Sequence, residues 1–516
     1  MQLEDRIFVG GGGKDYADSQ FLLLEYANRH GLIAGATGTG KTVTLQILAE
    51  GFSTMGVPVF LSDVKGDLSG LARAGDAGFK LHDAFLKRAG TIGITETYRY
   101  EAFPVTFWDL FGNDGHPVRT TVAEMGPLLL ARLMELTEAQ EGILNIAFRV
   151  ADEQGLALYD LKDLQSLLVW VGESRADLSL RYGNVSVASI GAIQRRLMVL
   201  ENQGGAEFFG EPALDLDDLF RTDPDGRGRI NILAADKLMA SPRLYATFLL
   251  WMLSELFESL PEVGDPDKPK LVFFFDEAHL LFDDAPKALV DKVEQVARLI
   301  RSKGVGVFFI TQNPDDVPED ILGQLGNRVQ HALRAYTARD RNALRMAAQT
   351  YRDNPDLDIE RAIREVGVGE AVTSFLERKG APGMAQQTLI RPPSSQLGPI
   401  TPMQRAEAMA NSPVNGKYDT RLDRDSAFEK LKARAETAAA EAEAAERAEE
   451  QATPMERDYR AGRRYSGSRV TRSSSRRSSR EISFGEAMGN MVVKELTGTT
   501  GRRLVRGILG GLFKGR

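Results

Sequence analysis

An eight-residue segment near the start of the chain restricts the possible folds more than any other feature. Gly35-Ala-Thr-Gly-Thr-Gly-Lys-Thr42 matches the pattern G-x-x-x-x-G-K-[ST]. It follows a short apolar run, residues 31–34, and precedes a helix-period run from Thr42 to Met55. A strand, a glycine-rich loop and a helix in this order bring backbone N–H groups and a helix N-terminus to one point, where they can bind phosphate. The segment therefore predicts an α/β fold with a nucleotide site.

The residues expected to bind the nucleotide are Gly35, Ala36, Thr37, Gly38, Thr39, Gly40, Lys41 and Thr42. The glycines let the loop curve around phosphate oxygens, because a residue without Cβ adopts positive φ at little cost. Lys41 would reach the β and γ phosphates, and the Thr42 hydroxyl would complete the coordination shell of Mg²⁺. The expected ligands are therefore ATP and Mg²⁺.

A second motif supplies the acids that nucleotide hydrolysis needs. The apolar run Leu271–Phe275 ends in Asp276 and Glu277, the form of a Walker B motif. Asp276 would hold Mg²⁺ through water, and Glu277, beyond the strand end, would polarise the attacking water. This pair favours an ATPase over a nucleotide-dependent switch.

Two further residues are candidates for contact with the γ-phosphate. Gln312 follows the apolar run Val305–Ile310 and would sense the γ-phosphate at the carboxyl edge of the sheet, or merely cap the strand end. Arg301, before the same run, is the candidate for an arginine that acts across a subunit interface, with Arg328 as an alternative. A basic residue also favours a helix C-terminus without any such role. Asp63, at the end of another apolar run, either faces the nucleotide or a subunit contact, or caps a turn.

Strand-like and helix-like runs alternate up to about residue 395. The expected strands are 31–34, 57–61, 229–233, 271–275 and 305–310, and the expected helices between them are 42–55, 244–260 and 286–302. The strands are apolar on both faces, which indicates a mainly parallel sheet covered by helices. About 165 residues separate the second and third strands, far more than a crossover needs. Helix-period runs at 125–149, 161–172 and 187–201 make this stretch a helical insertion.

We expect four parts in the chain. The ATPase core comprises residues 1–66 and 229–395, and a mainly helical insertion comprises residues 67–228. An Ala/Glu-rich helical linker with too few apolar positions to pack follows at 396–458. The last part, 459–516, is a basic Arg/Ser-rich tail with a terminal amphipathic segment. Residues 459–480 hold eight Arg, seven Ser and no acid, so we expect disorder there. The run Gly10–Gly13 is expected to form a mobile turn.

Composition excludes several kinds of site. The 516 residues include no cysteine and five histidines without two-histidine metal spacing, which excludes disulfides, thiolate zinc sites and cysteine nucleophiles. No window approaches the roughly 18 apolar residues of a membrane span, and the first residues do not resemble a signal peptide, so we expect a cytoplasmic protein. The net charge is −8, but residues 459–516 carry 14 Lys or Arg against three Glu, which leaves −19 for residues 1–458.

Four segments resemble the HerA/FtsK group of P-loop ATPases: Asn28–Thr42, Val59–Leu68, Phe275–His279 and Phe309–Pro314. The resemblance is closest to a bacterial HerA-like family, and we expect it to end near residue 395, before the tail. It implies a RecA-like core, a homo-hexameric ring with ATP at the subunit interfaces, and translocation of duplex DNA. It also implies the roles given above for the loop, the acids and Gln312, with Arg301 near the trans-acting arginine. HerA itself has a β-barrel domain before its phosphate loop, whereas here Gly35 is reached almost at once.

Two classes of function fit these features. The first is an ATP-driven hexameric DNA translocase or helicase. The charge of −19 on residues 1–458 disfavours this class unless pore loops or the Arg/Ser tail supply positive charge. The second is a ring ATPase that acts on protein partners, as a secretion-like machine or an assembly platform, with the helical insertion as its docking surface. In addition, the basic terminal segment is a candidate for binding an anionic membrane.

Overall fold

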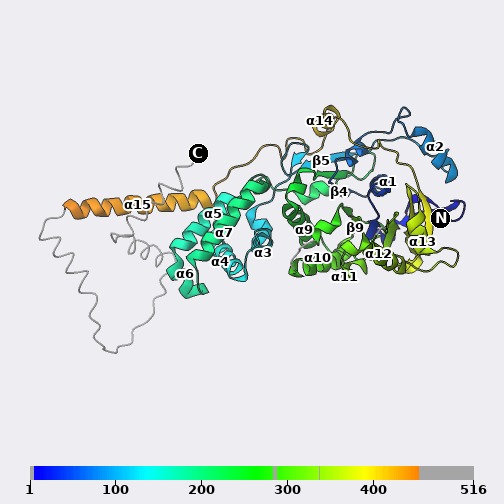
Figure 1. Cartoon of the computed structure of the whole chain (residues 1–516). Coiled ribbons are helices and arrows are strands. Elements are labelled where there is room, and N and C mark those ends of the chain that lie inside the picture. The colour runs from blue at the N-terminus through cyan, green and yellow to red at the C-terminus, as the bar shows by residue number, and fades with distance from the viewer. Residues whose placement is uncertain (1–4, 283–286, 336, 452–516) are drawn as a thin grey trace. The chain divides into compact units, whose positions relative to one another are not determined.

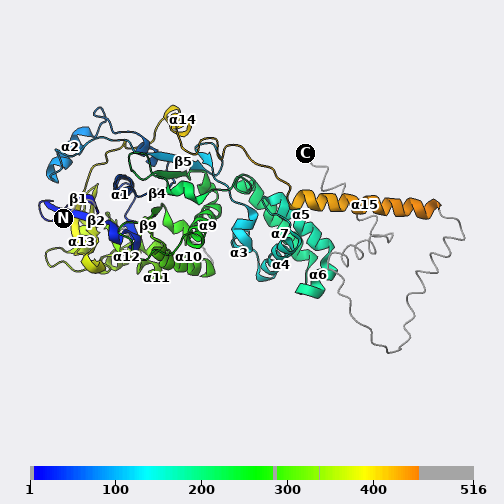
Figure 2. The ribbon, with the colours of Figure 1, turned by 180° about the vertical axis from the view of Figure 1, so that it is seen from behind.

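The computed structural model describes residues 5–282, 287–335 and 337–451, which form an α/β structure (Figures 1 and 2). In this part of the chain twelve strands form one sheet, in the order β2-β1-β14-β11-β10-β3-β9-β8-β4-β7-β5-β6. These strands are β1 (Arg6–Gly12), β2 (Asp18–Leu23), β3 (Gly31–Ala34), β4 (Val59–Asp63), β5 (Val105–Asp109), β6 (His116–Pro117), β7 (Ile230–Ala234), β8 (Leu271–Phe275), β9 (Val305–Thr311), β10 (Asn327–Gln330), β11 (Glu370–Ser374) and β14 (Gln386–Ile390). Strands from β10 to β6 pair in parallel, and the rest pair antiparallel. The mainly parallel sheet confirms the predicted fold class.

The helices of the described residues are α1 (Lys41–Thr54), α2 (His82–Thr91), α3 (Val122–Leu133), α4 (Glu138–Gln154), α5 (Leu161–Glu173), α6 (Arg175–Tyr182), α7 (Val187–Leu200), α8 (Ala206–Phe208), α9 (Pro242–Ser259), α10 (Lys287–Ile300), α11 (Glu319–Leu322), α12 (Ala338–Gln349), α13 (Ile359–Glu365), α14 (Pro402–Ala410) and α15 (Ala427–Gln451). The five predicted strands and three predicted core helices agree with these bounds to within two residues. The predicted helix at 125–149 is two helices, α3 and α4, separated by a turn.

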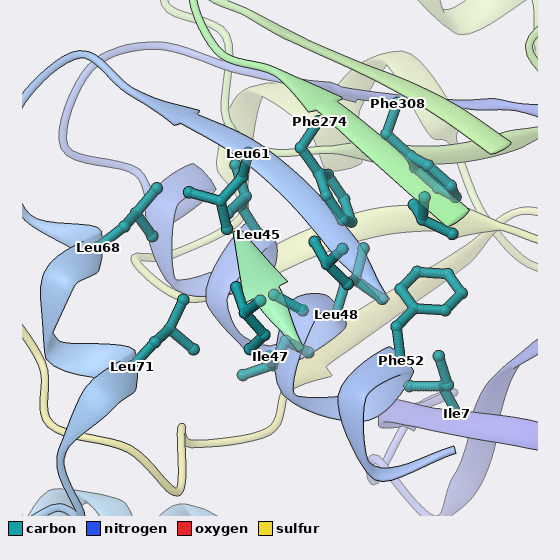
Figure 3. Close-up of a cluster of buried hydrophobic side chains, with 14 of the residues drawn as sticks. Ile7, Leu45, Ile47, Leu48, Phe52, Leu61, Leu68, Leu71, Phe274 and Phe308 are labelled. Carbon is teal, nitrogen blue, oxygen red and sulfur yellow. The ribbon is translucent and has the colours of Figure 1, made fainter. Parts of the chain in front are cut away.

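The central strands are buried on both faces because helices cover both sides of the sheet. On one face, Leu48 and Phe52 of α1 pack against Phe274 of β8 and Phe308 of β9 (Figure 3). Side chains alternate along a strand, so the neighbouring phenylalanines of β8 and β9 point to the opposite face. Helices α9 and α10 contact each other there, on the side of the sheet away from α14 (Figures 1 and 2). This double cover explains why the sequence of each central strand is a continuous apolar run.

The predicted mobile turn at Gly10–Gly13 is wrong, since Arg6–Gly12 forms strand β1 between β2 and β14. Its glycines are needed because neighbouring backbone is very close. A Cβ on Gly10 would lie 2.1 Å from the carbonyl oxygen of Leu389, and one on Gly11 would lie 2.0 Å from that of Tyr16. The strand therefore depends on the absence of side chains, a condition that hydrophobic periodicity does not report.

The described chain separates into two compact units. The larger unit contains the sheet and comprises described residues up to Asn145, Tyr159–Leu161 and Gly191–Asp423. The segment 67–228, expected to be mainly helical, contains α2 to α8 and also β5 and β6, which extend the sheet next to β7.

The smaller unit comprises Ile146–Leu158, Lys162–Ile190 and the described residues from Arg424 onwards. Within this unit the first turn of α15 is packed, contrary to the expectation that this linker has too few apolar positions to pack. Ala427 and Leu431 are buried, and the Phe428 N–H donates to the Asp163 carboxylate at 2.9 Å. The basic tail predicted for residues 459–516 lies outside the described residues. In the part of the chain that the structure covers, no helix has the length and apolar character of a membrane span.

Candidate nucleotide site

Four neighbouring parallel strands, β3, β9, β8 and β4, end at one edge of the sheet. The eight loop residues, from Gly35 to Thr42, connect β3 to α1 or begin that helix. Asp276 and Glu277 follow β8, and Gln312 follows β9. Because β9 pairs with β3 on one side and with β8 on the other, Gln312 is placed between the phosphate loop and the two acids. The sequence therefore brings the predicted loop, acids and amide to one edge.

The phosphate loop adopts a conformation that only glycine allows at several positions. Gly35, Gly38 and Gly40 have φ values of +149°, +79° and +117°. A Cβ on Gly35 would lie 2.5 Å from the Cβ of His331. The loop is held from the adjacent strand end, because Ala36 N–H donates to the Ala332 carbonyl at 2.8 Å. This positive-φ backbone is the concave arrangement of N–H donors expected of a phosphate site.

Lys41 lies under this loop. Its ammonium donates to the carbonyls of Gly35 and, at 3.3 Å, Ala36. Burial and the positive charge of Lys65 lower the pKa of Lys41, while Glu277 and Asp276 act in the opposite direction. The ammonium is therefore within electrostatic reach of both acids.

The Glu277 carboxylate has contacts at both oxygens. Oε1 is 3.1 Å from Lys65 Nζ, and Oε2 is 3.4 Å from Gln312 Nε2 and 3.4 Å from His279 Nδ1. The backbone of Glu277 has φ +51°, which is uncommon for a residue with a side chain and is associated with functional sites. The structure thus places Gln312 in contact with Glu277.

The two adjacent acids have opposite pKa shifts. Burial and the charge of Glu277 raise the pKa of Asp276 to about 7. Burial also disfavours ionised Glu277, but hydrogen bonds and charge from Lys65 outweigh it, so the pKa of Glu277 is lowered. The surroundings therefore favour the ionised form at Glu277 more than at Asp276.

Thr42 and Asp276 provide the oxygen ligands that a hard cation prefers. Asp276 is a desolvated carboxyl that a divalent cation would return to its ionised form. No cluster of three acidic or histidine side chains in the described ranges has metal-binding geometry. Magnesium in phosphate-loop sites is held by one hydroxyl, one carboxylate, phosphates and water, so the two residues fit it.

Arg301 and Arg328 are not part of this site within one chain. Arg301 precedes β9, whereas Gln312 follows it, so about 20 Å of strand separates them at about 3.3 Å per residue. Its guanidinium pairs with Asp265 at 3.0 and 3.2 Å. Arg328 donates to the carbonyls of Leu325 and Leu322.

Asp63 has the turn-capping geometry that we considered as one of its alternatives. Its Oδ2 accepts a hydrogen bond from the Leu68 N–H at 3.0 Å, and the side chain is almost fully buried.

Sequence reasoning did not select two residues of the site. Lys65 follows β4 at the edge that carries the acids, and its position after an apolar run was the available signal. His331 follows β10; its Nε2 accepts from the Thr44 hydroxyl at 2.8 Å and its Nδ1 donates to the Glu370 carbonyl at 2.9 Å. Burial lowers the pKa of His331 to about 4, so the ring is neutral. It connects Thr44 of α1 to the Glu370 carbonyl through its two hydrogen bonds.

A mainly parallel sheet that carries a phosphate loop, an acid pair and an amide at one edge defines a P-loop ATPase with a RecA-like fold. Enzymes of this class use ATP together with Mg²⁺. The chain belongs to the family described as helicase HerA-like C-terminal, whose model matches residues 12–516. The predicted resemblance is confirmed, but the match continues past residue 395, where we expected it to end.

Two solved structures illustrate the similarity. Plasmid coupling protein TrwB in complex with the non-hydrolysable GTP analogue GDPNP is 17% identical, over 74% of this chain and 89% of that chain, with a TM-score of 0.48. VirB4 of Thermoanaerobacter pseudethanolicus is 14% identical, over 78% of this chain and 99% of that chain, with a TM-score of 0.47. No curated protein sequence matches the chain.

Proposed function

We propose that this ATPase is a motor that assembles as a homo-hexameric ring and translocates duplex DNA. The observation that carries the hydrolytic part is the Glu277 carboxylate, 3.4 Å from Gln312 Nε2, at the edge of the sheet that carries the phosphate loop. Membership of a family named for a helicase supports the DNA part.

In this proposal the site residues divide the work between phosphate binding, metal binding and activation of water. The amides of Gly35 to Thr42 and the Lys41 ammonium bind the phosphates of ATP. Thr42 and Asp276 hold Mg²⁺, which neutralises charge on the β and γ phosphates when bound. Glu277 orients the attacking water and accepts its proton, and Gln312 holds the Glu277 carboxylate and senses the γ-phosphate.

Steady-state ATP hydrolysis by the purified full chain tests the site. Lys41→Ala should abolish nucleotide binding or turnover, because the phosphates lose their buried cation. Glu277→Gln should keep ATP binding and reduce kcat by roughly 10²- to 10⁴-fold, the scale of a lost general base. Wild-type turnover in Glu277→Gln would remove this residue from the mechanism.

Adding nucleic acid to the same assay tests the DNA part. Linear duplex should raise turnover several-fold, and the response should fade as salt increases, because Lys and Arg contacts to phosphate release counterions. Single-stranded DNA and RNA serve as comparisons, and Glu277→Gln is the blank. Turnover that no nucleic acid changes would contradict a DNA motor.

Two features favour a second candidate, a ring ATPase that acts on protein. The chain before residue 459 carries a charge of −19, which is unlike a surface built to bind phosphate. The smaller unit, with α5 and α6, could serve as a docking domain. A partner recovered with the full chain, and lost when residues 162–190 are replaced by a short linker, would support this candidate, provided that the variant still hydrolyses ATP.

A further inference from the structure

Lys65 contacts the acid that we expect to orient water. It lies two residues beyond β4, and its Nζ is 3.1 Å from Glu277 Oε1. The other oxygen of Glu277 faces Gln312 and His279, each at 3.4 Å. Side chains from three different segments therefore hold one carboxylate, and Lys65 is the one that supplies a full positive charge.

The turn that carries Lys65 is anchored at the end of β4. Asp63 Oδ2 accepts the Leu68 N–H at 3.0 Å, which closes the turn on that strand end. The Lys65 side chain is itself 42% exposed and has a flexible four-carbon stem. Its ammonium can therefore change partners while the backbone of the turn stays in place.

The charges at this edge make such a change favourable when a phosphate binds. The positive charge of Lys65 lowers the pKa of Lys41, so the two ammonium groups are near enough to repel each other. A γ-phosphate bound by Lys41 would carry more negative charge than a single carboxylate and would accept charge-assisted hydrogen bonds from both lysines. It would therefore compete with Glu277 for Lys65.

We propose that Lys65 senses the γ-phosphate: it holds Glu277 in an ion pair and exchanges this carboxylate for the γ-phosphate oxygens of bound ATP. The exchange frees Glu277 Oε1 to accept a hydrogen bond from the attacking water. ADP has no γ-phosphate and leaves the ion pair intact. The inference rests on the proposed role of Glu277, and it adds a residue that links readiness for hydrolysis to the identity of the nucleotide.

Lys65→Met tests the exchange, because methionine keeps a long unbranched stem without the charge. Calorimetric titration would give the Kd of the full chain for the ATP analogue AMPPNP and for ADP, each with Mg²⁺. AMPPNP binding should weaken by roughly 10- to 100-fold, the scale of one or two charge-assisted hydrogen bonds, while ADP binding stays within about twofold. Lys65→Arg should restore most of the preference for AMPPNP over ADP.

Lys237→Met is the matched control. Lys237 is 47% exposed and pairs with Asp114 at 2.9 Å, so it resembles Lys65 in exposure and in having one acidic partner. Neither affinity should change in this variant. Thermal melting of each variant checks that the fold is retained.

Removing the acid tests the same exchange from the other side. Glu277→Gln eliminates the carboxylate that competes for Lys65, so it should bind AMPPNP several-fold more tightly than wild type without tightening ADP. This gain should vanish in the Lys65→Met/Glu277→Gln double variant, since no ammonium remains to be released. Non-additive effects of this kind separate a direct coupling from two independent structural changes.

Two results would overturn the inference: an equal change in AMPPNP and ADP affinity in Lys65→Met, or a gain in Glu277→Gln that survives the loss of Lys65. Failure of the proposed function has a different signature, namely a wild-type chain that does not hydrolyse ATP or a Glu277→Gln variant with full turnover. The two outcomes are therefore distinguishable in one set of proteins.

Discussion

Glu50 of α1 joins the helix after the phosphate loop to the chain that follows β14. Its Oε2 accepts from Arg391 at 2.9 Å, and its Oε1 accepts the Ser394 and Ser395 N–H groups, both at 2.9 Å, and the Ser395 hydroxyl at 2.7 Å. Glu50 is 1% exposed and Arg391 is 13% exposed. We predict that Glu50→Gln destabilises the larger unit, because it removes the negative charge and points an NH₂ group at the guanidinium.

The size of this effect follows from the remaining contacts. Breaking a buried ion pair from one side typically costs about 3–5 kcal/mol. The glutamine keeps an acceptor for the serines, and Arg391 keeps the carbonyls of Phe8 and Ile47, so we expect the lower end, about 3 kcal/mol. For a unit of this size that corresponds to a fall of roughly 6 °C in Tm, at about 2 °C per kcal/mol.

Thermal unfolding followed by circular dichroism measures this fall. Glu407→Gln is the control, because Glu407 pairs with Arg73 at the surface, where an ion pair contributes about 1 kcal/mol or less. Amide exchange of α1 should also accelerate in Glu50→Gln. A Tm within about 1 °C of wild type, or an equal fall in the control, would refute the argument that this buried carboxylate anchors α1.

Three further predictions concern the site and its supports. Gly35→Ala should weaken ATP binding at least tenfold in a calorimetric titration, because φ is +149° and the new Cβ would overlap His331, whereas Gly142→Ala, with open space around it, should bind normally. Burial lowers the pKa of both His30 and His331 to about 4, whereas a histidine of the unfolded chain has a pKa of about 6.5. As pH falls from about 6.5 towards 4, the unfolded chain binds protons that the folded chain does not bind, so the free energy of unfolding decreases. At pH 5 each histidine accounts for a loss of about 2 kcal/mol in the free energy of unfolding. His331→Gln should therefore reduce the drop in Tm between pH 7 and pH 5. An unchanged drop would contradict the neutral buried state of His331. If Arg301 acts in a neighbouring subunit, Arg301→Ala should lower kcat roughly 10³-fold or more with unchanged ATP affinity, and an unaltered kcat would exclude that role.

The central strands and the loop could be predicted because each depends on local sequence. Leu271–Phe275 is a continuous apolar run that fits a strand buried on both faces, and the loop glycines need positive φ whatever surrounds them. Strand β1 could not be predicted in this way, because Gly10 is required by the backbone of β14, far along the chain.

The site shows the same division between local and distant information. The order of the strands, which places Gln312 between the loop and the acids, is a property of pairing that no single segment encodes. Lys65 was missed because its partner, Glu277, is more than two hundred residues away in the chain. The position of Arg301 relative to the loop depends on an assembly, which is why its role stays a prediction.

The pairing of β1 with β14 has a consequence for how the chain folds during synthesis. Register partners such as Gly10 and Ile390 are about 380 residues apart, so at a synthesis rate of about 5–20 residues per second β1 has only β2 beside it for roughly 20–80 s before β14 is made. An exposed apolar strand would tend to associate with other nascent chains during that time. The part of β1 that pairs with β14 is Gly10–Gly12, so the residues that wait for β14 add no apolar side chains to such association.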